Sequence, residues 1–361
     1  MSNNKQSRIR HHRMVVFSLL SLVVLTLVLP LIPYAIAELG ETAGNVANPG
    51  TEYWRDVRQR DRIVTGTTQV RGVDTDVLIN VTGEEWRQFR MGQLAPYGAI
   101  VLGVMVGILV VYYLVRGKIR IEAGRSGERV RRYTSAEMTV HWILAITFVL
   151  LALSGLILIY GRWVLIPLLG DAGFSATATA SKVIHNYGGL LFAAIVPVAF
   201  FLYLKDSLFN LKVDAKWFLR AGGYLGGEEP SAEKVNAGQK AWYWVAMLGG
   251  FVLVASGLVL DFPNIFQQGR EWLQGAHVIH TIVAIGVIVF FFVHLYLATI
   301  GVEGALESIT SGHVDANWAK QHHDLWYKEL QTGQGGGSAS EEPSMSGGSH
   351  AGGVASPIAK D

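Results

Sequence analysis

The sequence contains no cysteine among its 361 residues. This absence excludes disulfides, thiolate zinc sites, iron–sulfur clusters held by this chain and covalent attachment of a c-type haem. Any metal bound by the chain must therefore be held by histidine, methionine or carboxylate side chains.

Charged residues are also scarce. They make up 16% of the chain, whereas apolar residues make up 50%, and this balance is too apolar for a soluble protein. Repeated apolar runs, near or above the roughly 18 residues that a membrane span requires, predict an all-α integral membrane protein. The formal net charge of +2 is small, and the basic residues cluster beside the apolar runs, so nucleic acid is not an expected partner.

Residues 1–37 have the features of a targeting segment, because a basic start is followed by an apolar run and by small residues at Ala35 and Ala37. The apolar run is longer than that of most signal peptides. We therefore expect either a cleaved signal peptide or a retained N-terminal anchor. In both cases residues 38–95, which are polar with mixed charges, form a small extracytoplasmic segment.

The rest of the chain predicts one further span and then a four-helix domain. The span covers residues 96–115 and is followed by a basic linker at 116–136. The four-helix domain covers residues 137–302, with spans at about 137–160, 181–204, 241–261 and 276–300. A polar cytoplasmic segment at 303–332 and a Gly- and Ser-rich tail at 333–361, expected to be disordered, complete the chain.

Basic residues beside the spans predict the orientation. Within the linker, residues 116–132 include seven basic and two acidic residues, and the loop 205–240 is also rich in lysine. The loops on the opposite side hold only three basic residues, which are Arg162, Lys182 and Arg270. The basic side is expected to be cytoplasmic. The N-terminal segment then lies on the extracytoplasmic side, which in a bacterial inner membrane is the periplasmic side.

Five histidines lie in the four-helix domain, at positions 141, 185, 277, 280 and 294. Ionisable side chains within a bilayer are costly and usually functional. A helix turns by about 100° per residue, so His294 returns to within about 40° of His280, about 21 Å along the same face, whereas His277 points about 100° away from His294. Depth in the membrane then pairs His141 with His294 (the inner pair) and His185 with His280 (the outer pair).

Neutral imidazole is a good axial ligand for haem iron, and inward-facing ligands in helix bundles commonly hold such a macrocycle. The two pairs therefore predict two b-type haems, one near each membrane face. Four glycines permit either the close approach of a flat porphyrin or plain helix packing: Gly155, Gly188, Gly189 and Gly257.

The remaining histidines have weaker interpretations. His277 is a propionate partner, a proton-carrying group or a simple interfacial histidine. His313, His322 and His323 lie in the polar segment after the last span, where we expect contact with a partner or exposure to solvent rather than metal binding.

A faint repeat links two of the spans. Residues 148–158 read FVLLALSGLIL and residues 251–260 read FVLVASGLVL. Either the two helices are related as copies of one internal repeat, or they only share a similar apolar composition.

Residues 131–330 resemble the gamma (cytochrome b) subunit of membrane-bound formate dehydrogenases. The matching stretches are TVHW at 139–142, VIHN at 183–186, NAGQK at 236–240, His280, HLY at 294–296, WAKQHH at 318–323 and WY at 326–327. Their order and spacing together make the resemblance specific. The additional front half, which includes RGKIRIE at 116–122, resembles the longer bacterial variants of this subunit.

The resemblance implies a respiratory electron-transport role. A catalytic subunit with a molybdenum or tungsten pterin would oxidise formate outside the membrane, and an iron–sulfur beta subunit would pass electrons to the outer haem. The inner haem would then reduce quinone near the cytoplasmic face, in a pocket that matches Asn236, Gly238 and Gln239. This chain would be the quinone-reducing subunit and would not oxidise formate by itself. From the residues alone, Asn236 is also a helix N-cap candidate.

Two other functions stay open at this point. The first is a cytochrome b anchor of a hydrogenase or a thiosulfate reductase, whose four-helix cores are similar. The second is a haem-free membrane scaffold that only docks soluble partners.

Overall fold

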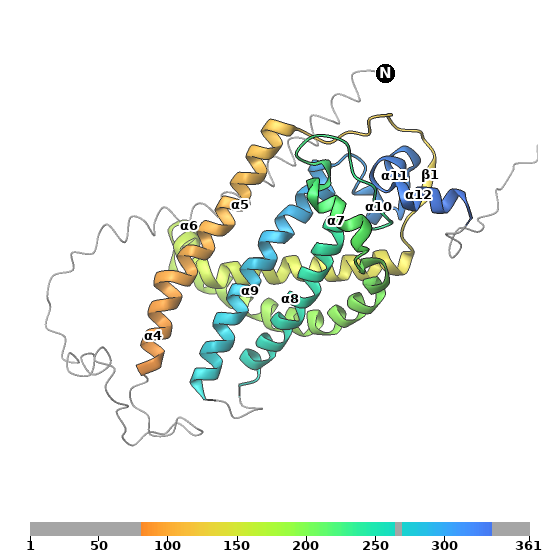
Figure 1. The fold of residues 1–361 in the computed structure, drawn as a ribbon. Coiled ribbons are helices and arrows are strands. Elements are labelled where there is room, and N and C mark those ends of the chain that lie inside the picture. The colour runs from red at the N-terminus through yellow and green to blue at the C-terminus, as the bar shows by residue number, and fades with distance from the viewer. Residues whose placement is uncertain (1–80, 264–268, 334–361) are drawn as a thin grey trace, which may run out of the picture.

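The computed structural model describes residues 81–263 and 269–333 (Figure 1). The targeting segment, most of the expected extracytoplasmic segment and the C-terminal tail lie outside the described residues. Within these ranges, four helices are long and apolar enough to cross a membrane. The expectation of an all-α integral membrane protein is thereby confirmed.

A nearly continuous helix precedes the four-helix domain. It consists of α4 (Val81–Phe89), the π-helical turn η1 (Arg90–Leu94) and α5 (Ala95–Arg116). The helix begins well before the expected span, and residues 81–95 are helical. Pro96 lacks an amide donor and its ring crowds the preceding turn, which accounts for the widened turn at η1.

Helix α6 (Ser135–Leu204) is a hairpin of two helical arms. Its 70 residues would extend about 105 Å if straight, far more than the roughly 30 Å of a bilayer core. The chain reverses at Gly170, where φ is 69° and ψ is 177°, and Figure 1 shows the two arms doubling back on each other. The Tyr203 hydroxyl donates to the backbone carbonyl of Glu137, so the end of the second arm returns to the start of the first.

The sequence predicted these two arms as separate spans with a loop over residues 161–180. The prediction of a loop is wrong, because the described chain is helical throughout this stretch except at Gly170. The stretch also contains Pro167, which lies within the helix, and only Gly170 departs from helical φ and ψ.

Helices α8 (Ala237–Asp261) and α9 (Arg270–Tyr296) complete the bundle. They approach closely at Gly249, where a Cβ atom would lie 2.5 Å from the Val287 side chain. The short elements η2 (Lys205–Ser207), α7 (Leu211–Leu219) and η3 (Ala221–Gly223) connect α6 to α8, and the π-helical turn η4 (Leu297–Gly301) extends α9.

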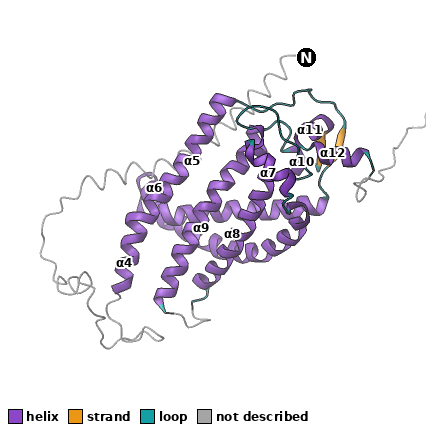
Figure 2. Cartoon of the chain, viewed as in Figure 1, coloured by secondary structure: helices purple, strands orange, loops and turns teal. Residues whose placement is uncertain are grey.

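The segments before and after the four-helix domain form one small structure, which we call the end cap (residues 116–134 and 302–333). Strand β1 (Arg129–Arg131) pairs antiparallel with β2 (His313–Asp315). Helices α10 (Glu307–Thr310), α11 (Ala316–His322) and α12 (Asp324–Gln331) gather at the same end of the molecule (Figure 2). The linker and the C-terminal segment therefore pack together instead of extending separately into solvent.

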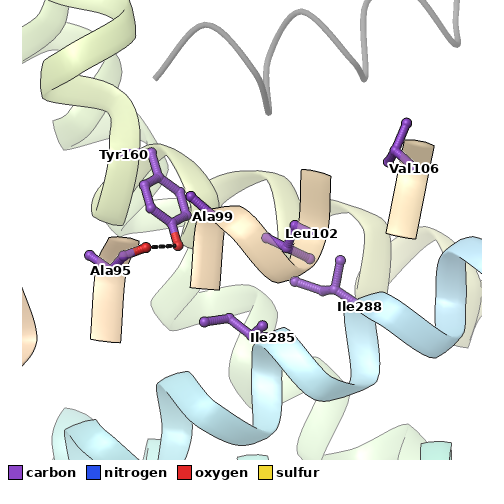
Figure 3. Packing of buried hydrophobic residues seen from close by; sticks show 7 residues of the cluster. All are labelled: Ala95, Ala99, Leu102, Val106, Tyr160, Ile285 and Ile288. Atoms are coloured by element: carbon purple, nitrogen blue, oxygen red, sulfur yellow. Dashed lines mark hydrogen bonds between the residues drawn. The ribbon is translucent and has the colours of Figure 1, made fainter. Parts of the chain in front are cut away.

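A buried apolar cluster attaches the additional helix α5 to the bundle (Figure 3). Leu102 of α5 is fully buried and packs in the cluster with Ile285 and Ile288 of α9. The Tyr160 hydroxyl of α6 donates to the Ala95 carbonyl at 2.9 Å. Gly98 lies so close to α9 that a Cβ atom there would be 2.4 Å from the Ile285 side chain.

The hairpin in α6 depends on the backbone freedom of Gly170. Its combination of positive φ and extended ψ is essentially restricted to glycine, so Gly170→Ala should destabilise the protein by about 1–3 kcal/mol. The measurement is the thermal midpoint of the purified chain in detergent. Gly107→Ala is the matched control, because a methyl group added at either glycine would meet no atom within 4 Å, whereas only Gly170 has a positive φ. Equal midpoints for the two variants would contradict this role.

Candidate functional site

The structure brings four of the membrane histidines together in two pairs. The rings of His141 and His294 have centroids 6.5 Å apart, and those of His185 and His280 are 6.1 Å apart. The two arms of α6 supply one member of each pair, and α9 supplies the other two from one face. These are the pairs that depth in the membrane selects.

The spacing within each pair fits a metal ion between two imidazoles. An imidazole nitrogen binds a first-row metal at about 2 Å and lies about 1.1 Å from its ring centre, so two axial ligands place their ring centres about 6.3 Å apart. Both observed separations lie within a few tenths of an ångström of this value. Nowhere in the described ranges do three or more His, Asp or Glu side chains form a metal-binding group. The pairs therefore suit a metal whose other ligands come from a macrocycle.

Hydrogen bonds to two serines fix the ring orientation of the outer pair. The Nδ1 atom of His185 lies 2.9 Å from the Ser154 hydroxyl, and that of His280 lies 2.9 Å from the Ser256 hydroxyl. Each serine donates its own proton to a backbone carbonyl four residues earlier, at 2.7 Å. The serines therefore accept from Nδ1–H, which leaves both Nε2 atoms unprotonated and able to bind a metal.

The glycine after each serine lets the histidine approach. A Cβ atom at Gly155 would lie 3.1 Å from Cε1 of His185, and one at Gly257 would lie 3.4 Å from Cε1 of His280. The Ser-Gly pairs occupy equivalent places in the faint repeat of the sequence. The repeated stretches thus share a structural task, which is to support one outer histidine each.

A cavity of about 240 Å³ lies beside the outer pair. Apolar side chains from α6, α8 and α9 line most of it, together with His185, His280 and both of the glycines just described. An apolar cavity bordered by two metal-competent nitrogens fits the flat, largely apolar face of a porphyrin.

The inner pair is packed against aromatic rings. Trp242 of α8 stacks on His294 with centroids 5.1 Å apart and an angle of 16° between the planes. Trp142 contacts the edge of the His141 ring at 5.7 Å. The Nδ1 atom of His141 is buried and has no hydrogen-bond partner among the described residues, so this ring lacks the serine support of the outer pair.

The fifth membrane histidine stands apart from these pairs. His277 lines the outer cavity, and its ring meets Trp86 of α4 edge to face with centroids 5.4 Å apart. Its Nδ1 atom is buried without a partner in the described part of the chain. The additional N-terminal helix thus contacts one of the polar residues that line the outer cavity.

The three residues matched to a quinone pocket lie at the start of α8. Asn236 and Gln239 form a reciprocal capping box, in which each side chain accepts a hydrogen bond from the backbone N–H of the other, at 2.9 and 3.1 Å. A Cβ atom at Gly238 would lie 2.6 Å from the Trp217 ring. The capping role that the sequence suggested for Asn236 is therefore present.

Two polar residues next to this capping box were not expected from the sequence to belong to a site. Arg132, which precedes α6, places its Nη2 atom 3.1 Å from Oε1 of Gln239 and 3.1 Å from Nε2 of His323. In the sequence, Arg132 was one of several arginines that indicated membrane orientation. Nothing in its spacing distinguished it from its neighbours.

The expected solvent exposure of His322 and His323 is wrong. His323 is 1% exposed and its ring contacts Trp318 and Trp326. The His322 side chain is also mostly buried and contacts Glu229 at 2.6 Å. The aromatic residues that flank these histidines in the sequence fold over them, and that flanking pattern was the available signal of burial.

Known proteins resemble the part of the chain that carries these histidines. Residues 132–312, half of the chain, match the prokaryotic cytochrome b561 family. The cytochrome b556(fdo) subunit of formate dehydrogenase from Escherichia coli (strain K12) is 29% identical over 208 residues, which are 56% of this chain and 94% of that protein. The cytochrome b556(Fdn) subunit of the nitrate-inducible enzyme from the same strain is 30% identical over 199 residues, 53% of this chain and 87% of that protein.

A third relative extends the comparison to another organism. The formate dehydrogenase cytochrome b556 subunit of Haemophilus influenzae is 28% identical over 218 residues, 58% of this chain and 87% of that protein. The segment that matches the family begins at Arg132 and contains both histidine pairs. The chain therefore belongs to the prokaryotic cytochrome b561 family, as a relative of the cytochrome b556 subunits of formate dehydrogenases.

Proposed function

We propose that this chain is the membrane cytochrome b subunit of a formate dehydrogenase complex and holds two b-type haems. His141 and His294 would bind the inner haem iron, and His185 and His280 the outer one. The observation that carries the proposal is the spacing of the two ring pairs, 6.5 and 6.1 Å, which suits bis-histidine ligation. When bound, the haems supply reversible one-electron chemistry at two depths in the membrane.

The protein's own part is to hold the ligands and exclude water. Ser154 and Ser256 keep the outer imidazoles in the tautomer that exposes Nε2. Hydrogen bonds of this kind orient metal ligands and raise their basicity. Trp242 stacks on His294 and restricts its rotation.

The basic linker and loops support an orientation in which the end cap is cytoplasmic and the outer pair is near the periplasm. In that orientation an iron–sulfur beta subunit, together with a formate-oxidising subunit that carries a molybdenum or tungsten pterin, would dock on the periplasmic side. The names of the three relatives described above, each a formate dehydrogenase subunit, support this choice of partners.

Quinone is the proposed electron acceptor, bound near the cytoplasmic face beside Asn236, Gly238 and Gln239. Gln239 lies one helical turn before Trp242, which stacks on His294. An amide group at this position along α8 supports a quinone bound beside the inner pair. Formate would release its proton outside while quinone takes up protons from inside, so turnover would build a proton gradient across the membrane.

The reduced-minus-oxidised optical spectrum of the purified full chain tests haem binding. We expect b-type bands that fall to about half in His141→Ala and in His185→Ala, because each variant removes an axial ligand from one of two haems. His313→Ala is the control, since it removes a histidine that lies in β2, outside both pairs and the outer cavity, and should leave the full signal. An absence of b-type bands in the wild-type chain would show a haem-free scaffold instead.

Removal of a serine should change the outer haem selectively. Ser154→Ala or Ser256→Ala deletes the acceptor of an Nδ1–H hydrogen bond, which lowers the basicity of that ligand and stabilises oxidised iron less. The midpoint potential of the outer haem should therefore rise while that of the inner haem stays unchanged. Optical redox titration of the purified chain measures both values. Equal shifts of the two haems, or no shift in either, would contradict the tautomer assigned to the outer pair.

A further inference from the structure

A largely buried polar cluster joins three distant parts of the chain at the start of α8. Its members are Arg132 before α6, Gln239 in the first turn of α8 and His323 between α11 and α12. The Nη2 atom of Arg132 lies 2.7 Å from the Lys234 carbonyl oxygen, 3.1 Å from Oε1 of Gln239 and 3.1 Å from Nε2 of His323. The two protons of this guanidinium nitrogen are shared among the three acceptors, and the nitrogen connects the end cap to the start of α8.

Arg132 carries a charge with little compensation. The residue is only 5% exposed, and within the described ranges no carboxylate lies within ion-pair distance of it. The rings of Trp318 and Tyr133 flank it, at 5.0 and 5.2 Å from the guanidinium carbon. Its Nε atom is buried and has no partner among the residues that the structure describes. Burial without a counterion is expensive for a cation, so the site attracts electron-rich groups.

His323 acts in this cluster as a neutral acceptor. Burial and the adjacent positive charge of Arg132 hold the pKa of His323 well below its ordinary value. Its Nδ1–H donates to the Glu233 carbonyl at 2.6 Å, which leaves the lone pair of Nε2 for Arg132. The histidine thus fixes the position of the guanidinium without adding a second charge.

The same contacts determine how the Gln239 amide is oriented. Its Oε1 atom accepts from two donors, the backbone N–H of Asn236 and the Arg132 guanidinium. The two donors identify this atom as oxygen, so the NH₂ group points the other way. In the described part of the chain, no acceptor lies within hydrogen-bond distance of this Nε2 group.

Asn236 differs from Gln239 in this respect. Its Oδ1 atom accepts from the Gln239 backbone N–H, and its side chain also interacts with the Tyr224 hydroxyl. The capping residue is therefore committed to the protein. Gln239 is the member of the pair that keeps an amide donor for a ligand.

We infer that Arg132 is a positioning residue for quinone reduction: it holds the Gln239 amide so that Nε2–H donates to a quinone carbonyl oxygen beside the inner pair. His323 holds Arg132 in turn. The positive charge of Arg132 stabilises the negative charge that develops on the carbonyl oxygen as quinone takes up electrons. This inference rests on the proposed function, and it adds the two residues that make one amide competent as a donor.

Reoxidation of the reduced haems by quinone tests the inference. The full chain in lipid nanodiscs is reduced with a slight excess of dithionite and mixed with decylubiquinone or menadione, and haem oxidation is followed by stopped-flow absorbance. Arg132→Gln should raise the half-saturating quinone concentration by at least about tenfold, because the Gln239 amide loses the contact that orients its Nε2–H toward the quinone and the carbonyl oxygen loses a nearby positive charge. The haem spectrum should stay unchanged. Arg131→Gln, an exposed neighbour with the same change of charge, is the control and should behave as wild type.

The Gln239→Glu variant distinguishes the role of the amide as a hydrogen-bond donor to quinone from its role in the helix capping box. Glutamate at this position retains the capping box and gains an ion pair with Arg132, so the thermal midpoint should not fall. It loses the NH₂ donor, so the half-saturating quinone concentration should again rise by at least about tenfold. A purely structural role for the cluster would give the opposite pattern, with a lower midpoint for Arg132→Gln and wild-type quinone kinetics for Gln239→Glu.

The results for the wild-type chain and for the variants test the proposed quinone reduction and the positioning role of Arg132 separately. If decylubiquinone and menadione both fail to oxidise the haems of the wild-type chain, the proposed quinone reduction is wrong. If the wild-type chain reacts and Gln239→Glu reacts equally well, the positioning role is wrong while the proposed function stands. Should Arg132→Gln fail to assemble with haem, the Gln239→Glu result decides alone.

Discussion

Two facing pairs of imidazole rings determine how the bundle can be arranged. Rings at 6.1 and 6.5 Å require both arms of α6 to lie against one face of α9 at two depths. An acceptor for the Nδ1 proton stabilises a polar ring in an apolar bundle, because an unsatisfied polar group in the membrane interior costs several kcal/mol. Ser154 and Ser256 supply such acceptors for the outer pair. The reversal at Gly170 is a second requirement, since without it the two arms could not face α9 together.

The end cap contributes to the inner end of the same arrangement. The linker before α6 and the segment after α9 are far apart in the sequence, yet they form one two-stranded sheet. Arg132 reaches from this cap to the first turn of α8, and His323 contacts Arg132 within the cap. Lys240 in the same turn is fully buried and pairs with Asp214 and Glu233. The start of α8 is thus held by charged contacts on several sides, which suits a site where a small polar ligand must be oriented.

Much of this organisation follows from regular periodicities that a sequence displays. Helical phase and depth selected the two histidine pairs and set His277 aside, because both quantities depend only on the rise and twist of a helix. The single-residue reversal at Gly170 did not follow, since one glycine in an apolar run is also compatible with a continuous helix. The burial of His323 and the role of Arg132 depend on a sheet formed by segments distant in the sequence, and no local pattern records that contact. The serine acceptors were visible only as a faint repeat, whose purpose requires the rings of His185 and His280 to be in place.

Electron paramagnetic resonance of the oxidised full chain tests the paired ligation most directly. Two histidine pairs predict two low-spin ferric haem signals of equal intensity, because each iron would be bound by two histidine nitrogens. A single low-spin signal, or a high-spin ferric signal from iron with one axial histidine, would contradict the arrangement of His141 with His294 and of His185 with His280.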